Sequence, residues 1–92
     1  MSKLDRSPIG GRIREARKAS GFTQEKLGIE AGIDETVASA RMSQYENNVH
    51  TPDFQFVKKL SELLNVPTAY FYAEEDELAE LISKFEPSIN LA

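Results

Sequence analysis

Two closely spaced glycines, Gly21 and Gly32, most constrain what this chain can fold into. Each follows a segment with helical patterning, and glycine readily adopts the left-handed backbone that ends a helix. Between them, Thr23 followed by Gln24 and Glu25 has the composition of a helix start, because a threonine oxygen accepts a free N–H of the first turn. Two short helices joined so tightly must cross steeply, and the next helix then projects from the surface. The pattern predicts a helix-turn-helix.

The chain has the size and composition of one small domain. Its 92 residues provide room for a single core, and the absence of cysteine excludes disulfides and thiolate metal sites. The first residues lack the apolar run of a signal peptide, and no segment is apolar enough to span a membrane. We therefore expect a cytoplasmic protein with no metal and no small-molecule cofactor.

The charge is unevenly distributed. The net charge is −4, but residues 1–51 carry 8 Lys and Arg against 7 Asp and Glu, whereas residues 52–92 carry 3 against 8. Contact with nucleic-acid phosphates depends on local clusters of basic residues rather than on net charge. We expect the first half to face duplex DNA, with the projecting helix in the major groove.

Apolar residues recur at helical spacing along the chain, and no segment alternates like a strand. Ser7-Pro8 and Thr51-Pro52-Asp53 have the cap-and-proline pattern that opens a helix, and Asn47-Asn48 is typical of a helix end. The predicted fold is all-α, with helices at about residues 8–20, 23–32, 34–47, 52–64, 69–72 and 74–85. The expected inner faces contain Ile9, Ile13, Ala16, Leu27, Ala31, Ile33, Val37, Met42, Tyr45, Phe54, Val57, Leu60, Leu63 and Leu64.

The ordered motifs resemble the Cro/repressor-type helix-turn-helix family, also called the Xre or lambda-repressor-like family. The matching segments are Gly11 to Lys18, Gly21 to Leu27, Ala31-Gly32-Ile33, Met42-Ser43-Gln44-Tyr45-Glu46, Thr51-Pro52-Asp53 and Leu60 to Val66. The resemblance covers residues 9–72 and implies a compact bundle of about five helices, to which this chain adds a C-terminal amphipathic helix. We expect a helix-turn-helix domain with a short N-terminal arm over residues 1–73, and a C-terminal helix and tail over residues 74–92.

The chain departs from the usual family pattern at three places. Gly28 stands where alanine is usual, and Asn48 where glycine is common. The segment that leads to Glu46 is longer by roughly four residues, about one helical turn. The third helix therefore either begins a turn early or is preceded by a loop. Asp34 as a cap and Val37 on the inner face favour the early start.

The resemblance implies that the third helix reads bases, while helix two and its flanks contact phosphates. Gln44 has the donor and acceptor for adenine, Arg41 the fork for guanine, and Ala40 a methyl contact for thymine. The base-contact candidates are Ser39, Ala40, Arg41, Ser43 and Gln44. The phosphate-contact candidates are Arg12, Thr23, Gln24, Asn47, Asn48 and His50, with Lys3 and Arg6 on the N-terminal arm.

Some basic residues have structural alternatives. Arg14 and Lys18 belong either to the DNA-facing surface or to a solvated helix face. Arg17 is expected to pair with Glu46, because the family's glutamate at this place often braces helix one.

We expect a sequence-specific transcription regulator of bacterial or phage type, a repressor that binds an inverted-repeat operator as a homodimer. An enzyme is not expected, because the chain has one histidine and no nucleophile–base pairing. The C-terminal apolar face either joins two subunits or caps the monomer's core. The interface candidates are Phe56, Tyr70, Leu78, Leu81, Ile82 and Phe85. The competing hypothesis is an antitoxin-like protein-interaction module whose helix-turn-helix autoregulates.

Overall fold

The computed structural model describes residues 7–85, and this part of the chain contains six α-helices and no strand. The predicted all-α class is therefore confirmed. None of these helices is long and apolar enough to cross a membrane. The helices are α1 (Ile9–Ala19), α2 (Gln24–Glu30), α3 (Ala38–Glu46), α4 (Phe54–Leu64), α5 (Thr68–Tyr72) and α6 (Asp76–Ser83).

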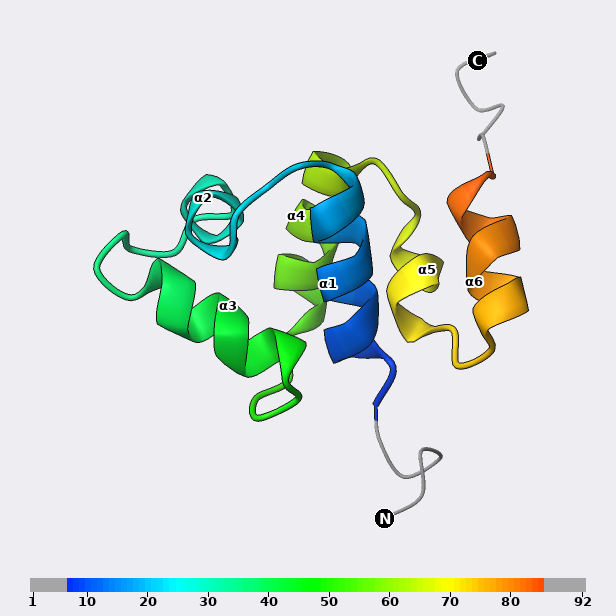
Figure 1. Ribbon diagram of the computed structural model, residues 1–92, viewed down its shortest axis with the longest axis horizontal. Helices are drawn as coiled ribbons and strands as arrows, with labels where there is room; N and C mark the ends of the chain where they lie inside the picture. Colours follow the sequence, from blue (N-terminus) through cyan, green and yellow to red (C-terminus); the bar gives the residue numbers. More distant parts are fainter. Residues whose placement is uncertain (1–6, 86–92) are drawn as a thin grey trace.

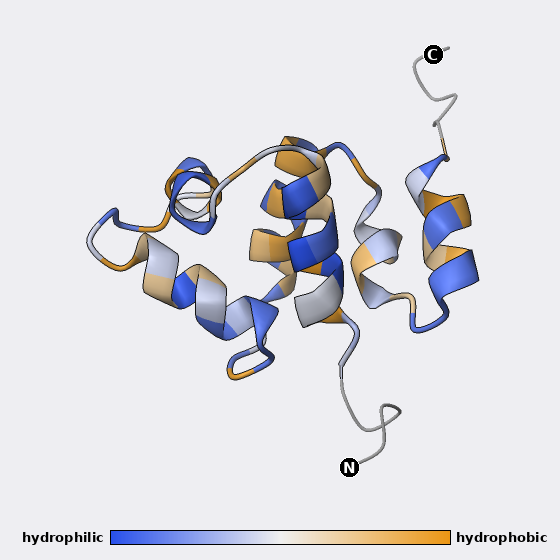
Figure 2. Cartoon of the chain, in the orientation of Figure 1, coloured by the Kyte–Doolittle hydropathy of each residue, from blue (hydrophilic) through white to orange (hydrophobic). Residues whose placement is uncertain are grey.

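Helix α1 lies at the centre of the molecule beside α4, with α2 and α3 on one side and α5 and α6 on the other (Figure 1). Polar and apolar residues mix along the helices, as expected when each buries one face (Figure 2). All six helices contribute to the core, α6 through Ala79, and the largest fully buried side chains are Phe71, Ile13, Leu27, Met42, Leu60 and Val57.

The predicted ends of the short helices are confirmed. Gly21 and Gly32 have φ angles of 80° and 102°, the left-handed region that glycine occupies without strain. The Thr23 Oγ1 accepts the backbone N–H of Lys26 at 3.0 Å and caps α2. After α3, Asn48 adopts φ 60° and turns the chain toward α4.

The early start predicted for the third helix is wrong, because α3 begins only at Ala38. The Asp34 Oδ1 accepts both the backbone N–H and the hydroxyl of Thr36, each at 2.8 Å, and so closes a turn instead of capping a helix. These hydrogen bonds, the backbone one first, lower the pKa of Asp34. Val37 is exposed and does not continue the inner face. The extra residues form a turn between α2 and α3.

Two other boundaries differ from the predictions by a few residues. Helix α4 begins at Phe54, and its cap is Asp53, whose Oδ1 accepts the N–H of Phe56 at 2.9 Å. Phe54 lies in the exposed first turn, so its expected place on the inner face is wrong. Helix α6 spans Asp76–Ser83, shorter at both ends than the apolar pattern indicated.

Candidate nucleic-acid interface

Helices α2 and α3 pack against each other at very short distance. Leu27 and Met42 are fully buried between them. A Cβ placed on Gly28 would lie 3.0 Å from both the Ala38 Cβ and the Met42 Cγ. A larger residue at position 28 would push the two helices apart, which explains why glycine stands there. The close packing holds α3 in a fixed orientation to the rest of the domain.

The outer face of α3 is free of contacts with the core. Ala38 and Met42 point inward, so Ala40, Gln44 and Asn47, spaced four and three residues apart, lie along the opposite side of the helix. The base-contact candidates Ser39, Ala40 and Arg41 are exposed, and Ser43 and Gln44 are half-buried. Among residues 7–85, Arg41 takes part in no ion pair shorter than 4.0 Å. The structure thus brings these five candidates together on one accessible helix.

A buried carboxylate joins this helix to the first two. The Arg17 Nε and Nη2 donate to the Glu46 carboxylate at 2.6 and 3.2 Å, and the Arg17 Nη1 donates to the Phe22 carbonyl at 2.9 Å. The Gln24 Nε2 donates to the same carboxylate at 3.0 Å. Burial acts to raise the pKa of Glu46, but the hydrogen bonds from Arg17, Gln24 and Arg14 outweigh it and lower the pKa. The structural pairing expected for Arg17 and Glu46 is confirmed.

The phosphate-contact candidates other than Arg12 fall into two groups. Thr23, Gln24 and His50 keep polar groups at or near the surface, and one N–H of the Gln24 amide remains for another acceptor. The side chains of Asn47 and Asn48 already have partners within the domain. The Asn47 Nδ2 donates to the Ser43 carbonyl at 2.9 Å, and the Asn48 Oδ1 accepts the Gly10 N–H at 3.1 Å.

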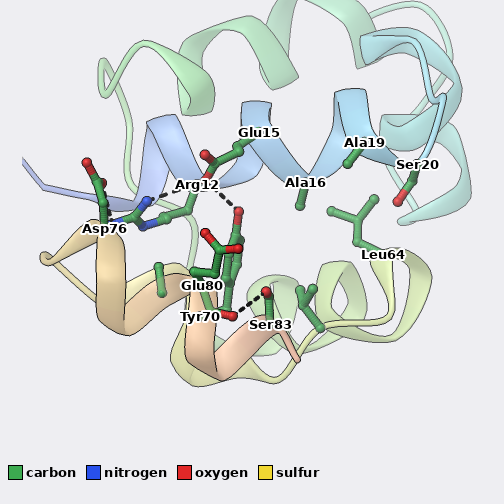
Figure 3. A pocket seen from close by; sticks show the side chains of 12 residues that line it. Arg12, Glu15, Ala16, Ala19, Ser20, Leu64, Tyr70, Asp76, Glu80 and Ser83 are labelled. Carbon is green, nitrogen blue, oxygen red and sulfur yellow. Dashed lines mark hydrogen bonds and ion pairs between the residues drawn. The ribbon is translucent and has the colours of Figure 1, made fainter. Parts of the chain in front are cut away.

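Arg12 does not fit the phosphate-contact role predicted for it, because its residue is only 7% exposed. Its Nε donates to the Ala73 carbonyl at 3.0 Å, and its Nη2 donates to the Asp76 Oδ1 at 3.1 Å. The guanidinium also lies 5.9 Å from the centre of the Tyr70 ring, within cation–π range. Figure 3 shows Arg12 and Asp76 at one end of a groove between α1 and α6. Arg12 fastens residues 68–83, called here the α5–α6 segment, to α1.

The six predicted residues of the dimer interface differ in how far they are buried. Tyr70 is buried and donates its hydroxyl to Glu15 at 2.7 Å; burial and this acidic neighbour raise its pKa. Phe56 packs against Tyr45 with ring centres 5.2 Å apart, and Ile82 packs against the core. Tyr70 therefore belongs to the monomer's own core, whereas Phe56 and Ile82 pack against that core but stay partly exposed, so they remain predicted interface residues. Three exposed apolar residues of the C-terminal segment remain: Leu78 at 46%, Leu81 at 68% and Phe85 at 61%.

Sequence reasoning left the role of Arg14 open. In the structure its Nη2 donates to the Asn47 Oδ1 at 3.2 Å, and its Nε lies 3.4 Å from the Glu46 Oε1. Its spacing from Arg17 on α1 was the available signal, since positions three apart share a helix face. The arm residues Lys3 and Arg6 lie outside the described residues.

Comparisons with known proteins agree with this architecture. Residues 10–77 match the model of the helix-turn-helix domain family. The chain is 34% identical over 68 residues to the HTH-type transcriptional regulator ImmR of Bacillus subtilis, covering 74% of this chain and 50% of that protein. It is 37% identical over 70 residues to the regulator SinR of Bacillus licheniformis, covering 75% of this chain and 60% of that protein. The chain thus spans about half to three fifths of the length of these curated relatives.

Two solved structures are similar to most of this arrangement. The crystal structure of the transcriptional regulator BswR superposes with a TM-score of 0.80 at 44% identity, over 90% of this chain and 85% of that one. The N-terminal DNA-binding domain of SinR from Bacillus subtilis gives a TM-score of 0.62 at 32% identity, over 74% of this chain and 94% of that one. With the packed α2–α3 pair and its exposed outer face, these matches show that the chain belongs to the Xre-like helix-turn-helix family of DNA-binding transcription regulators, which are not enzymes.

Proposed function

We propose that this chain binds duplex DNA sequence-specifically by laying the outer face of α3 in the major groove. The observation that carries the proposal is that Ala40 and Arg41 are exposed, and Gln44 is half-buried, on a helix whose opposite side is locked into the core. An α-helix fits the width of the major groove, where each base pair presents its own pattern of donors and acceptors. The fixed packing against α2 limits the entropy lost on binding.

The side chains on the outer face of α3 would contact the bases. Arg41 has the two parallel donors that match guanine O6 and N7, and Gln44 has the amide that matches adenine N6 and N7. Ala40 offers a methyl group to a thymine methyl. Ser39 and Ser43 lie at the margins and can donate to or accept from base edges or phosphates.

Backbone contacts flank the reading helix. Gln24 lies in the first turn of α2, where free N–H groups and the helix dipole favour a phosphate. Its tie to Glu46 fixes the amide while one N–H stays available. Thr23 and His50 supply further donors near this face, and Lys3 and Arg6 would add salt-dependent attraction from the arm.

We propose that two copies assemble through the exposed apolar residues Leu78 and Leu81 of α6 and Phe85, which follows the helix. Ala79 and Ile82 seat the helix on its own domain, which leaves these three large apolar residues uncovered. Self-association of one apolar stripe is isologous and two-fold. A two-fold dimer reads two half-sites about 10–10.5 base pairs apart, an inverted repeat. Bound across a promoter, it would act as a repressor.

A second candidate role is protein interaction through the same face. The structure of a SinR protein/SinI protein complex matches this chain with a TM-score of 0.62 at 30% identity, so a relative assembles with another protein. An antitoxin-like module would present α6 to a different protein rather than to its own copy.

Selection of binding sites from a random duplex library tests the proposal. Enrichment of an inverted repeat with half-sites one turn apart is the expected outcome. The selection is then repeated with Arg41→Ala, which should relax preference at one position per half-site and cost about 1–3 kcal/mol there. A library that remains random after several rounds would reject stand-alone sequence-specific binding.

A further inference from the structure

We propose that Arg14 is a contact to the DNA phosphate backbone at the C-terminal end of the reading helix, held in place by Glu46 and Asn47. The inference rests on the proposed function and adds to it a residue and a chemical role. It follows from which basic side chains of α1 are already used inside the domain.

Three arginines of α1 have different surroundings. Arg12 is buried against the α5–α6 segment, and Arg17 is fixed by the buried carboxylate of Glu46 and by the Phe22 carbonyl. The Arg14 side chain is 44% exposed. Of the three guanidinium groups, that of Arg14 is the one that reaches both the solvent and the end of α3.

The charges of Arg14, Arg17 and Glu46 do not cancel. Arg17 lies 2.6 Å from the Glu46 carboxylate and neutralises it. Arg14 approaches the same carboxylate only to 3.4 Å, beyond the usual length of a charge-assisted hydrogen bond. One carboxylate therefore faces two guanidinium groups, and a net positive charge is left on the exposed member. An anion brought to Arg14 meets an unneutralised charge.

The position of Arg14 points to the phosphate backbone rather than to the bases. Its Nη2 donates to Asn47, which lies on the outer face of α3, one residue beyond the helix. A group at the end of a helix in the major groove meets the wall of the groove, which is the sugar–phosphate chain. The amide of Asn47 is used by Ser43 and by Arg14 itself. At this end of the helix the guanidinium is therefore the better donor.

The hydrogen bond to Asn47 and the longer contact with Glu46 also prepare Arg14 for binding. A free arginine side chain loses considerable rotamer entropy when it contacts a ligand. Here two partners already restrict the guanidinium, so less entropy is lost when a phosphate arrives.

The test is the salt dependence of binding, measured by fluorescence anisotropy for the full chain. The probes are a 30-base-pair duplex that contains the selected operator and a scrambled duplex of the same length and composition. Each phosphate contact contributes about 0.9 to the slope of log K against log salt concentration. Arg14→Ala should lower the slope by about that amount on both duplexes. Arg14→Lys should keep most of it, because a lysine retains the charge.

The matched control is Lys18→Ala, which removes the same charge from an exposed position one turn further along α1. A thermal midpoint within about 5 °C of wild type would show that Arg14→Ala remains folded, as expected for a half-exposed pair. A slope loss specific to Arg14→Ala and rescued by Arg14→Lys supports the inference. Equal slopes for Arg14→Ala and Lys18→Ala, or a slope that Arg14→Lys does not restore, would overturn the inference about Arg14. Binding of the operator by the wild type would still support the proposed function in that case. If the wild type binds neither duplex, both the inference about Arg14 and the proposed function are wrong.

Discussion

Two adjacent glycines in the first turn of α1 should respond in opposite ways to the same substitution. A Cβ on Gly10 would lie 2.5 Å from the Glu46 carbonyl oxygen, 2.9 Å from the Glu46 carbonyl carbon and 2.8 Å from the Asn48 Oδ1. A Cβ on Gly11 would meet nothing within 4 Å. The first position marks the close approach of α1 and α3, whereas the second faces open space.

The magnitudes follow from these surroundings. Alanine at either position restricts the unfolded chain and favours the helix by about 0.5–1 kcal/mol. At Gly10 the obstacle is backbone, so α1 must move away from α3, an overpacking cost of about 1–3 kcal/mol. The Gly10 N–H bond to Asn48, at 3.1 Å, would be lost as well, for about another 1 kcal/mol. Gly10→Ala should therefore be less stable than Gly11→Ala by about 2–4 kcal/mol.

The assay is urea unfolding followed by far-ultraviolet circular dichroism, with all proteins at one concentration because a dimer's stability depends on it. Gly11→Ala should unfold at a higher urea concentration than wild type, and Gly10→Ala at a lower one. Thermal midpoints should differ in the same order, by at least about 8 °C between the two variants. Equal midpoints would refute the close approach of α1 and α3, and with it the placement of the reading helix.

Three other perturbations test separate parts of the structure. Glu46→Gln leaves Arg17 without its buried partner and should cost about 3–5 kcal/mol at pH 7, measured by urea unfolding. Because folding lowers the pKa of Glu46, its carboxylate stabilises the fold fully above the ordinary glutamate pKa, and this stabilisation is lost as the pH falls through the folded value. On acidification the wild type should therefore lose this part of its free energy of unfolding, and the variant should not. Leu81→Glu changes a side chain that is 68% exposed, so the monomer should stay folded while its sedimentation shifts from dimer to monomer; an unchanged dimer would exclude α6 as the interface. Arg12→Met leaves the Ala73 carbonyl without its donor and should speed hydrogen exchange in α6 more than in α4, whereas uniform changes would contradict its role as the fastening of the α5–α6 segment.

Much of the fold was predictable because its signals are local. Gly21 and Gly32 end helices by a property of their own backbone, and Thr23 caps α2 through a residue three positions away. Asp34 shows where local reasoning stops. Its carboxylate satisfies a backbone N–H equally well in a helix cap and in a turn, and the position of α3 against α2 decides between them.

From the sequence, the exposed face of the site could be predicted, but the contacts of its individual side chains could not. Arg12 and Arg14 are both basic residues of α1, and nothing in their near neighbours distinguishes them. Arg12 is buried because the α5–α6 segment, far along the chain, returns over it; its bond to Ala73 spans 61 positions. Such long-range contacts leave no periodic trace in the sequence. The exposed face of α3 followed from the helical pattern, but the ties that occupy Asn47 and Asn48 did not.

The central claim, that the outer face of α3 lies in the major groove, is tested most directly by affinity cleavage. The chain contains no cysteine, so a single introduced cysteine carries an iron chelate at one known place. Ala40→Cys is exposed on the outer face of α3, and Glu62→Cys on α4 is the labelled control. We predict that the chelate at position 40 cuts the operator at two clusters about one helical turn apart, one in each half-site, and that the control cuts weakly or not at all. Diffuse cleavage from position 40, or equal cleavage from both positions, would contradict the account.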